Sequence, residues 1–286
     1  MCRYFWAIVG FLIFMGASPA QAQDDAMARY EAAMQAADKA LDRDRERTAP
    51  NHLDDAEAAL AEMAGDHPLA QGRILVLRTG VERERQDWDD AFAHIDRAVN
   101  LLARGGAEDR ELGDAQYSRG YIAYRAEEYV AAEDAFLEAV RAYQTSRGLD
   151  DTRRLRANGW YVLARHRNEA FGYANENYVY GQAFVFSNVA AYPDPELQAL
   201  YPLGEWSEPM MIQIPYTAFV GRTHGFAVAQ YELDRNGQPR DVEIIVSYPG
   251  RVFDDAARES LRTGRRVAEG RGPNGYVTIF SMVVER

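Results

Sequence analysis

Few of the residue types that commonly carry catalysis or bind metals lie near one another in this sequence. No two of the five histidines are spaced four apart, the spacing with which one helix face holds a metal ion. They are His52, His67, His94, His166 and His224. The one cysteine, Cys2, lies in a segment that we expect to be removed, which would leave no thiol chemistry or disulfide. We therefore predict no catalytic residue, no metal site and no cofactor.

Two short polar runs could still do chemistry. The paired carboxylates Asp254-Asp255 could serve acid–base catalysis, but they stand where a helix is expected to begin, and the helix dipole favours acidic side chains there. We interpret that pair as structural. The run His166-Arg167-Asn168-Glu169 is expected to lie on the solvated face of a surface helix.

The charge distribution excludes one class of partner. The formal net charge is -12, and the excess acid lies before Tyr216, because acids and bases nearly balance after it. Nucleic-acid binding requires clustered basic side chains that release phosphate counterions, so we predict no nucleic-acid partner. The acidic part is read as a solvated, self-repelling face, with an acidic docking surface as the alternative.

The N-terminus has the pattern of a secretory signal. Arg3 is followed by an apolar run from Phe5 to Ala17 and by small residues in Ser18–Ala22, so we expect cleavage before Gln23. The run is shorter than the ~20 residues that span a bilayer. Residues 1–22 are therefore predicted to be a signal peptide of a periplasmic protein. A retained anchor, the only expected membrane contact, is the alternative.

Residues 23–174 are predicted to be helical, and part of this region repeats. Trp88, Ala91, Ile95 and Ala98 follow spacings of three, four and three, and the same spacings recur from Tyr129 onward. The second set is Tyr129, Ala132, Phe136 and Ala139, preceded on another helix by Gly120. The turns Gln86-Asp87 and Glu127-Glu128 occupy matching positions.

This pattern resembles the tetratricopeptide repeat. In that family a small residue lets two antiparallel helices approach, and an aromatic residue fills the turn. The period here is longer than the ~34 residues usual in that family, because the loop 104–109 is extended. The resemblance implies stacked helical hairpins, with a further helix from Asp151 to about Tyr173 as a cap.

Residues 175–215 are rich in aromatic residues and proline, which is too apolar for a disordered linker. We expect loops or short strands that lie along the helical domain. Residues 216–286 then change to strand periodicity. We predict strands at 226–233 and 241–247, an Asn236-Gly237 hairpin with positive φ at both central positions, a helix at 254–266 and a last strand at 276–285. Val242, Ile244 and Val246 are expected to share one face. The fold class is therefore α+β.

The order strand, strand, helix, strand resembles the C-terminal domain of TonB-family proteins. The matching segments are Gly225–Val228, Asp234–Gly237, Asp241–Ile244 with Val246-Ser247, Phe253–Ala257 and Val277–Ile279. Residues 265–269 depart from the family, which has a tryptophan and an aromatic–proline pair there, and the family's energy transducers retain a membrane anchor. The resemblance implies that the last strand is a docking edge for a partner's extended segment. The implied binding residues are Tyr276, Val277, Thr278, Ile279, Phe280, Ser281 and Met282.

These features together predict a periplasmic protein–protein interaction protein and not an enzyme. Its partner would be an envelope protein, for which a segment of an outer-membrane protein is one candidate, and a homo-oligomer is another arrangement. Two alternatives stay open. One is an envelope hydrolase with an unrecognised site near residues 175–215, and the other is a structural envelope factor that self-associates through its edge strand.

The N-terminal prediction can be tested directly. We expect the protein purified from a cell-envelope fraction to begin at Gln23, because the small residues Ala20 and Ala22 are those that a signal peptidase reads. N-terminal sequencing checks this, with Ala22→Arg as a variant that should block cleavage. Recovery of the intact N-terminus from the wild type would favour the retained anchor.

Overall fold

The computed structural model describes residues 19–41, 47–146, 151–174, 183–187, 206–208, 223–266 and 275–284. The chain divides into two compact units, residues 1–67 and 68–286. The apolar run of the predicted signal peptide lies outside the described residues. Among the helices that are described, none is both long and apolar enough to cross a membrane.

The first unit contains helices α1 (Pro19–Leu41) and α2 (Ala49–Ala61), which pack against each other. Arg29 of α1 forms an ion pair with Glu62, just after α2. From the sequence, Pro50-Asn51 indicates a break before a helix that begins at His52 with Asn51 as its cap, and this prediction was wrong. Pro50 instead lies in the first turn of α2, where a proline is tolerated because that N–H has no helical acceptor.

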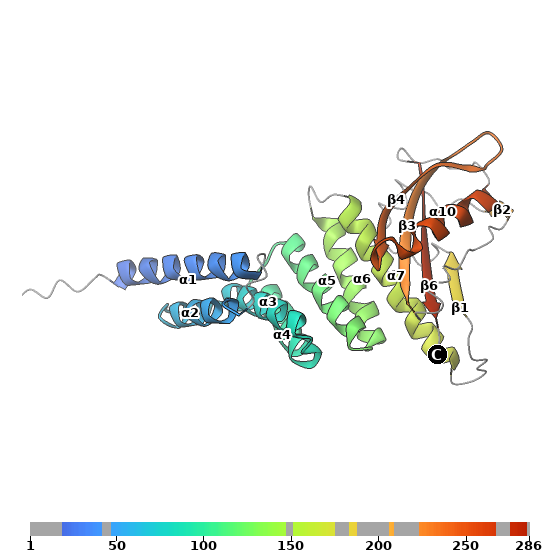
Figure 1. The fold of residues 1–286 in the computed structure, drawn as a ribbon. Helices are drawn as coiled ribbons and strands as arrows, with labels where there is room; N and C mark the ends of the chain where they lie inside the picture. The colour runs from blue at the N-terminus through green and yellow to red at the C-terminus, as the bar shows by residue number, and fades with distance from the viewer. Residues whose placement is uncertain are drawn as a thin grey trace, which may run out of the picture. The chain divides into compact units, whose positions relative to one another are not determined.

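The second unit begins with five helices, whose lengths and order match the predicted hairpins (Figure 1). They are α3 (Pro68–Arg85), α4 (Trp88–Arg104), α5 (Asp109–Arg125), α6 (Tyr129–Thr145) and α7 (Asp151–Ala174). The offset from the start of α3 to the start of α5 equals the offset from the start of α4 to the start of α6. The first and the second helices of the two pairs therefore begin with one common offset.

Equivalent close contacts hold each pair together. A Cβ added to Gly72 would lie 2.9 Å from Leu102 Cγ, and one added to Gly113 would lie 2.6 Å from Tyr143 Cε1. Gly113 follows Gly72, and Tyr143 follows Leu102, by the same number of residues that separates the starts of α3 and α5. A Cβ added to Gly120 would likewise lie 2.7 Å from the ring of Phe136, so a small residue is needed there, as its predicted role requires. Small residues thus set the distance between the paired helices.

A second repeated contact joins each pair to the next helix. The guanidinium carbon of Arg125 lies 5.0 Å from the centre of the Trp88 ring, and that of Arg167 lies 4.5 Å from the centre of the Tyr129 ring. Trp88 and Tyr129 are the aromatic residues that begin the second helix of each pair. They therefore form cation–π contacts with the first helix of the following pair.

The turns within the two pairs share an unusual backbone conformation. Gln86 and Glu127 have φ values of 63° and 64°, in the left-handed region. In each turn the next amide donates to the carbonyl five residues earlier, from Asp87 to Glu82 and from Glu128 to Ala123. This is the Schellman arrangement, which normally places glycine at the left-handed position.

The described strands form a four-stranded antiparallel sheet in the order β1-β6-β3-β4 and a small two-stranded sheet. The larger sheet contains β1 (Ala183–Ser187), β3 (Gly225–Leu233), β4 (Pro239–Tyr248) and β6 (Tyr276–Val284). The smaller one pairs β2 (Trp206–Glu208) with β5 (Arg265-Arg266). Helices followed by a small antiparallel sheet make this an α+β fold, as predicted.

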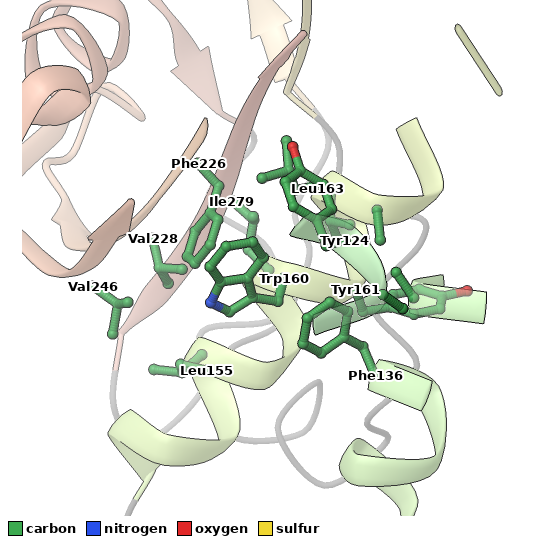
Figure 2. Close-up of a cluster of buried hydrophobic side chains, with 14 of the residues drawn as sticks. Tyr124, Phe136, Leu155, Trp160, Tyr161, Leu163, Phe226, Val228, Val246 and Ile279 are labelled. Carbon is green, nitrogen blue, oxygen red and sulfur yellow. The ribbon is translucent and has the colours of Figure 1, made fainter. Parts of the chain in front are cut away.

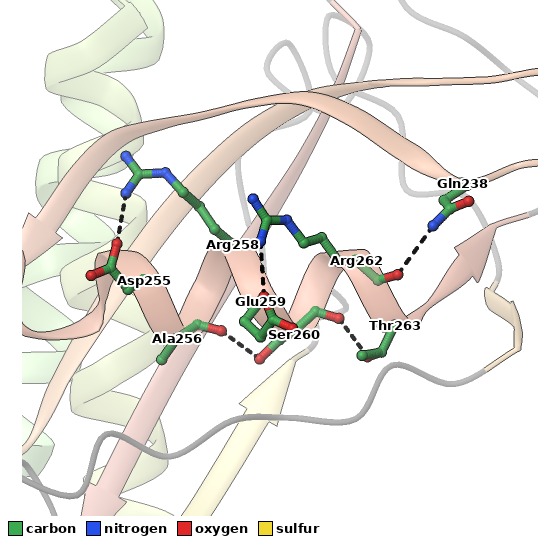
Figure 3. A network of polar contacts seen from close by, with 8 residues as sticks. All are labelled: Gln238, Asp255, Ala256, Arg258, Glu259, Ser260, Arg262 and Thr263. Carbon is green, nitrogen blue, oxygen red and sulfur yellow. Dashed lines mark hydrogen bonds and ion pairs between the residues drawn. The ribbon is translucent and has the colours of Figure 1, made fainter.

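Helices cover both faces of the larger sheet (Figure 1). On one face, α7 contacts β3, β4 and β6. On the other lies α10 (Asp254–Thr263), which follows a short 3-10 turn (Gly250–Phe253). Phe253, Ala257 and Leu261 pack there in one cluster with Tyr231 and Tyr276. The charged side chains of α10 pair along the helix, for example Asp255 with Arg258 at 3.2 Å (Figure 3).

Two details of the β3–β4 hairpin differ from the predictions. A bulge between Ile244 and Val246 places Val246 in the cluster on the α7 face, whereas Val242 and Ile244 pack on the α10 face. At the turn, only Gly237 has a positive φ, of 76°. The Asp234 carboxylate accepts hydrogen bonds from two turn amides, so this is a longer turn with glycine at its left-handed position.

The strained turns generate a stability prediction. Glu127→Gly should raise the free energy of unfolding by about 0.5–1 kcal/mol. The reason is that the steric cost of a left-handed conformation, which glycine does not have, exceeds the cost of the entropy that glycine adds to the unfolded chain. The neighbouring change Glu128→Gly is the control. Glu128 is also exposed but has φ −84°, so this change relieves no left-handed strain and should not raise the free energy of unfolding. Urea denaturation measures both, and destabilisation by Glu127→Gly would contradict the turn geometry.

Candidate functional site

The centre of the second unit is the packing of α7 between the helical pairs and the sheet. The ring of Trp160 on α7 lies 5.5 Å from that of Phe136 on α6 and 5.5 Å from that of Phe226 on β3 (Figure 2). Val228, Val246 and Ile279 of the sheet complete the same buried cluster. Helices and sheet therefore share one core and do not form separately packed domains.

A close approach of backbones makes this packing fit. A Cβ added to Gly159 would lie 2.4 Å from the Phe226 ring, so glycine is required where α7 meets β3. We predicted α7 as a cap for the helical array. It does follow α6 as the first helix of a third pair would. Besides α6, the described elements that pack on α7 include the strands β3, β4 and β6.

The prediction for His166 was wrong. Its side chain is 6% exposed and its Nδ1 contacts the hydroxyl of Ser281 on β6. Two turns of α7 separate His166 from Gly159, which puts both residues on the helix face that meets the sheet. The sequence run suggested a solvated helix face, because it cannot reveal that a sheet from the end of the chain covers α7.

The predicted binding residues all lie on β6, and the six side chains described there are buried. Val277 and Ile279 pack on the α7 face, and Tyr276 and Phe280 pack on the α10 face. Thr278 shares a hydrogen bond of 2.9 Å with Tyr231. Ser281 contacts His166, and Met282 lies opposite Gly225 of β3. A partner could therefore read β6 through its backbone, but not through the side chains that are described.

The position of β6 in the sheet also differs from the expectation. We expected the last strand at the edge, but β3 pairs with residues 276–282 on one side and β1 pairs with residues 280–284 on the other. We had placed the segment that contains β1 along the helical domain. Part of the predicted docking edge is thus covered by the protein's own chain. Whether a partner binds at β6 stays a prediction.

The opposite edge of the sheet is poorly suited to accept another strand. On β4, Arg240, Asp241 and Glu243 are exposed, and Asp241 has a φ of 52°. The pairing of β3 with β4 shifts register at two places. Charged side chains and bulges are common devices that keep edge strands from pairing with other chains. The β1 side of β6 is therefore the better candidate for strand recognition.

The described residues do not assemble a metal site, since no group of three or more histidine, cysteine, aspartate or glutamate side chains is placed to hold an ion. Asp255 at the start of α10 pairs with Arg258, which fits its structural interpretation. Of the segment 175–215, in which a hydrolase site was hypothesised, only residues 183–187 and 206–208 are described. Most of that hypothesis lies outside the described residues.

Sequence analysis missed β1 as a member of the sheet. The only local signal is the short apolar run Ala183–Ser187, within a segment for which we predicted loops or short strands. Which strand it would pair with depends on residues at the far end of the chain, because pairing in a sheet is a non-local contact.

Comparison with known proteins adds no identity to this geometry: no family model, curated protein or solved structure matches the chain.

The aromatic core around Trp160 predicts how stability depends on alkaline pH. Burial raises the pKa of Tyr117 to about 12, from an ordinary value of about 10. Folding therefore favours the neutral phenol, and this contribution is complete below pH 10 and lost as the pH rises through 12. Burial also raises the pKa of Tyr124, and burial with the nearby Asp114 raises that of Tyr143.

We therefore expect Tyr117→Phe to lose less stability than the wild type above pH 10. The difference in unfolding free energy between the two proteins should shift by about 1–2 kcal/mol in favour of the variant between pH 8 and about pH 11.5. Denaturant titrations at both pH values measure it. Because Tyr124 and Tyr143 are present in both proteins, their contributions cancel. A difference that does not change with pH would contradict the burial of Tyr117.

Proposed function

We propose that this protein is an exported, periplasmic interaction protein that acts by binding and not by catalysis. In this proposal the tetratricopeptide-like helical pairs form a scaffold, and the TonB-like sheet recognises an extended segment of an envelope protein. A segment of an outer-membrane protein is one candidate partner. No cofactor is required.

The repeated contacts support the scaffold role. Gly72 with Leu102, Gly113 with Tyr143 and the two cation–π contacts recur with nearly one period. Ion pairs also connect the first helices of successive pairs, Arg73 to Glu111 at 2.6 Å and Asp114 to Arg153 at 2.8 Å. Elements that repeat in this way present their surfaces in a regular arrangement, which is how helical-repeat proteins hold partners.

The observation that carries the proposal is the pairing of β1 with β6. A five-residue segment from outside the strand-strand-helix-strand motif adds to the outer side of β6 in antiparallel register. An extended segment of another protein would satisfy the same backbone groups in the same way. Recognition through backbone groups also agrees with the burial of the described β6 side chains, since it needs none of them to be exposed.

Deleting β6 would be a poor test of this proposal, because Val277 and Ile279 belong to the core shared with Trp160. Hydrogen exchange leaves the chain intact. We expect an envelope protein that is captured with this protein, and that captures it in turn when the tag is exchanged, to slow amide exchange in residues 276–279 of β6, which lie beyond the β1 ladder. The reason is that added strand pairing protects backbone amides from solvent. Mass spectrometry of the purified complex, with the free protein beside it, gives the comparison.

Exchange in α3 to α6 serves as the internal reference of that measurement. Slower exchange confined to those helices would move recognition to the scaffold and contradict the strand-pairing part of the proposal. If no envelope protein is captured in both directions, with the tag on either protein, the proposed interaction function fails.

A further inference from the structure

The strand β1 occupies the position in which a partner strand would have to bind. Its register is explicit: Ala183 lies opposite Val284, Val185 opposite Met282 and Ser187 opposite Phe280. Among the described strands, β6 is the only neighbour of β1. A partner segment and β1 cannot both pair with this part of β6.

Over the residues that the structure describes, the β1 ladder is the shortest in the larger sheet. It joins five residue pairs, whereas β3 pairs with β6 over seven, from Gly225 opposite Met282 to Tyr231 opposite Tyr276. Short edge strands with one neighbour contribute little stability by themselves. The side chains of β6 that form the two cores also pack against α7, α10 and β3. Removal of β1 therefore leaves the partners of those cores in place.

The chain connections keep a released β1 close to its site. Only the short stretch 175–182 separates the end of α7 from the start of β1, and the stretch 188–224 separates the end of β1 from the start of β3. A strand tethered in this way competes at an effective concentration on the order of millimolar. An external strand then binds only the molecules in which β1 has been released. Its apparent affinity is its intrinsic affinity multiplied by the fraction of those molecules.

We infer that β1 is an internal competitor that covers the docking position on β6, so that a partner strand pairs there only when β1 leaves. This inference rests on the proposed function. It also defines the partner's chemistry, because the segment that already fits is uncharged and apolar, Ala-Phe-Val-Phe-Ser. The partner would be an extended, uncharged segment of this kind on another protein.

A disulfide across the ladder tests the inference, because the natural chain has one cysteine. In the full chain carrying Cys2→Ser, the pair Val185→Cys with Met282→Cys would join directly opposed residues. Such residues have Cα atoms about 4.5–5.5 Å apart, within the range that a disulfide spans. Phe184→Cys with Val283→Cys provides a second lock, since neighbouring pairs in an antiparallel ladder alternate in type.

The probe is a fluorescent peptide with the sequence of residues 181–189, whose binding is followed by anisotropy. We expect the oxidised form of each locked variant to bind it at least ~10-fold more weakly than the reduced form of the same variant. Equal binding by both redox forms would overturn the inference. Failure of both cysteine pairs to oxidise would overturn it too, because the register on which it depends would be wrong.

A released variant gives the opposite result. The double variant Phe184→Pro with Val185→Pro removes a backbone N–H from the β1 ladder, because one of these two neighbouring residues donates to β6. This variant should bind the peptide at least ~10-fold more tightly than the wild type does. Phe184→Ala with Val185→Ala keeps both donors and is the matched control, for which we expect a smaller gain. No gain in the proline pair would contradict the inference. The locked forms decide the question if the proline pair does not fold.

The outcomes separate this inference from the proposed function. If a captured envelope partner binds the oxidised and reduced forms equally, β1 does not regulate the site, while the interaction function stands. If the lock controls the peptide but the natural partner protects only α3 to α6, the strand-pairing function fails. A dimer in light scattering, formed by the proline pair and absent from its alanine control, would place a second copy at β6 and overturn the partner-strand assignment.

Discussion

The second unit depends on the packing of one face of α7 against the sheet. Gly159 admits the ring of Phe226, and the neighbouring Trp160 contacts α6, β3 and β4 at once. Because interiors are close-packed, this arrangement fixes the sheet relative to the helices (Figure 2). Loss of the Trp160 side chain would remove contacts from both parts of the unit together.

This packing explains how two architectures are combined in one unit. The helical pairs repeat with a constant offset, and α7 begins within one position of where a third pair would start under that offset. The described residues after α7 supply no second helix for that third pair, and a sheet built largely from the end of the chain packs on α7. A repeat array has to cover the apolar face of its terminal helix, and here the sheet does so.

The same burial limits how β6 can recognise anything. Its described side chains are buried, so its outer backbone groups are what it can offer. Backbone pairing selects a partner weakly by sequence, since every residue except proline carries the same donor and acceptor. A competing strand from the same chain would add selectivity, because only a segment that pairs better than β1 could displace it.

Local patterns in the sequence determined most of the elements. The apolar spacings placed α4 and α6, and the glycine-bearing turn and alternating residues placed β3, β4 and β6, because these depend on neighbours within a few residues. The burial of His166, the bulge that turns Val246 to the α7 face and the pairing of β1 with β6 were decided by the tertiary structure alone. Each depends on contacts between segments far apart in the chain, where the geometry of packing and not the local residue pattern selects the neighbour.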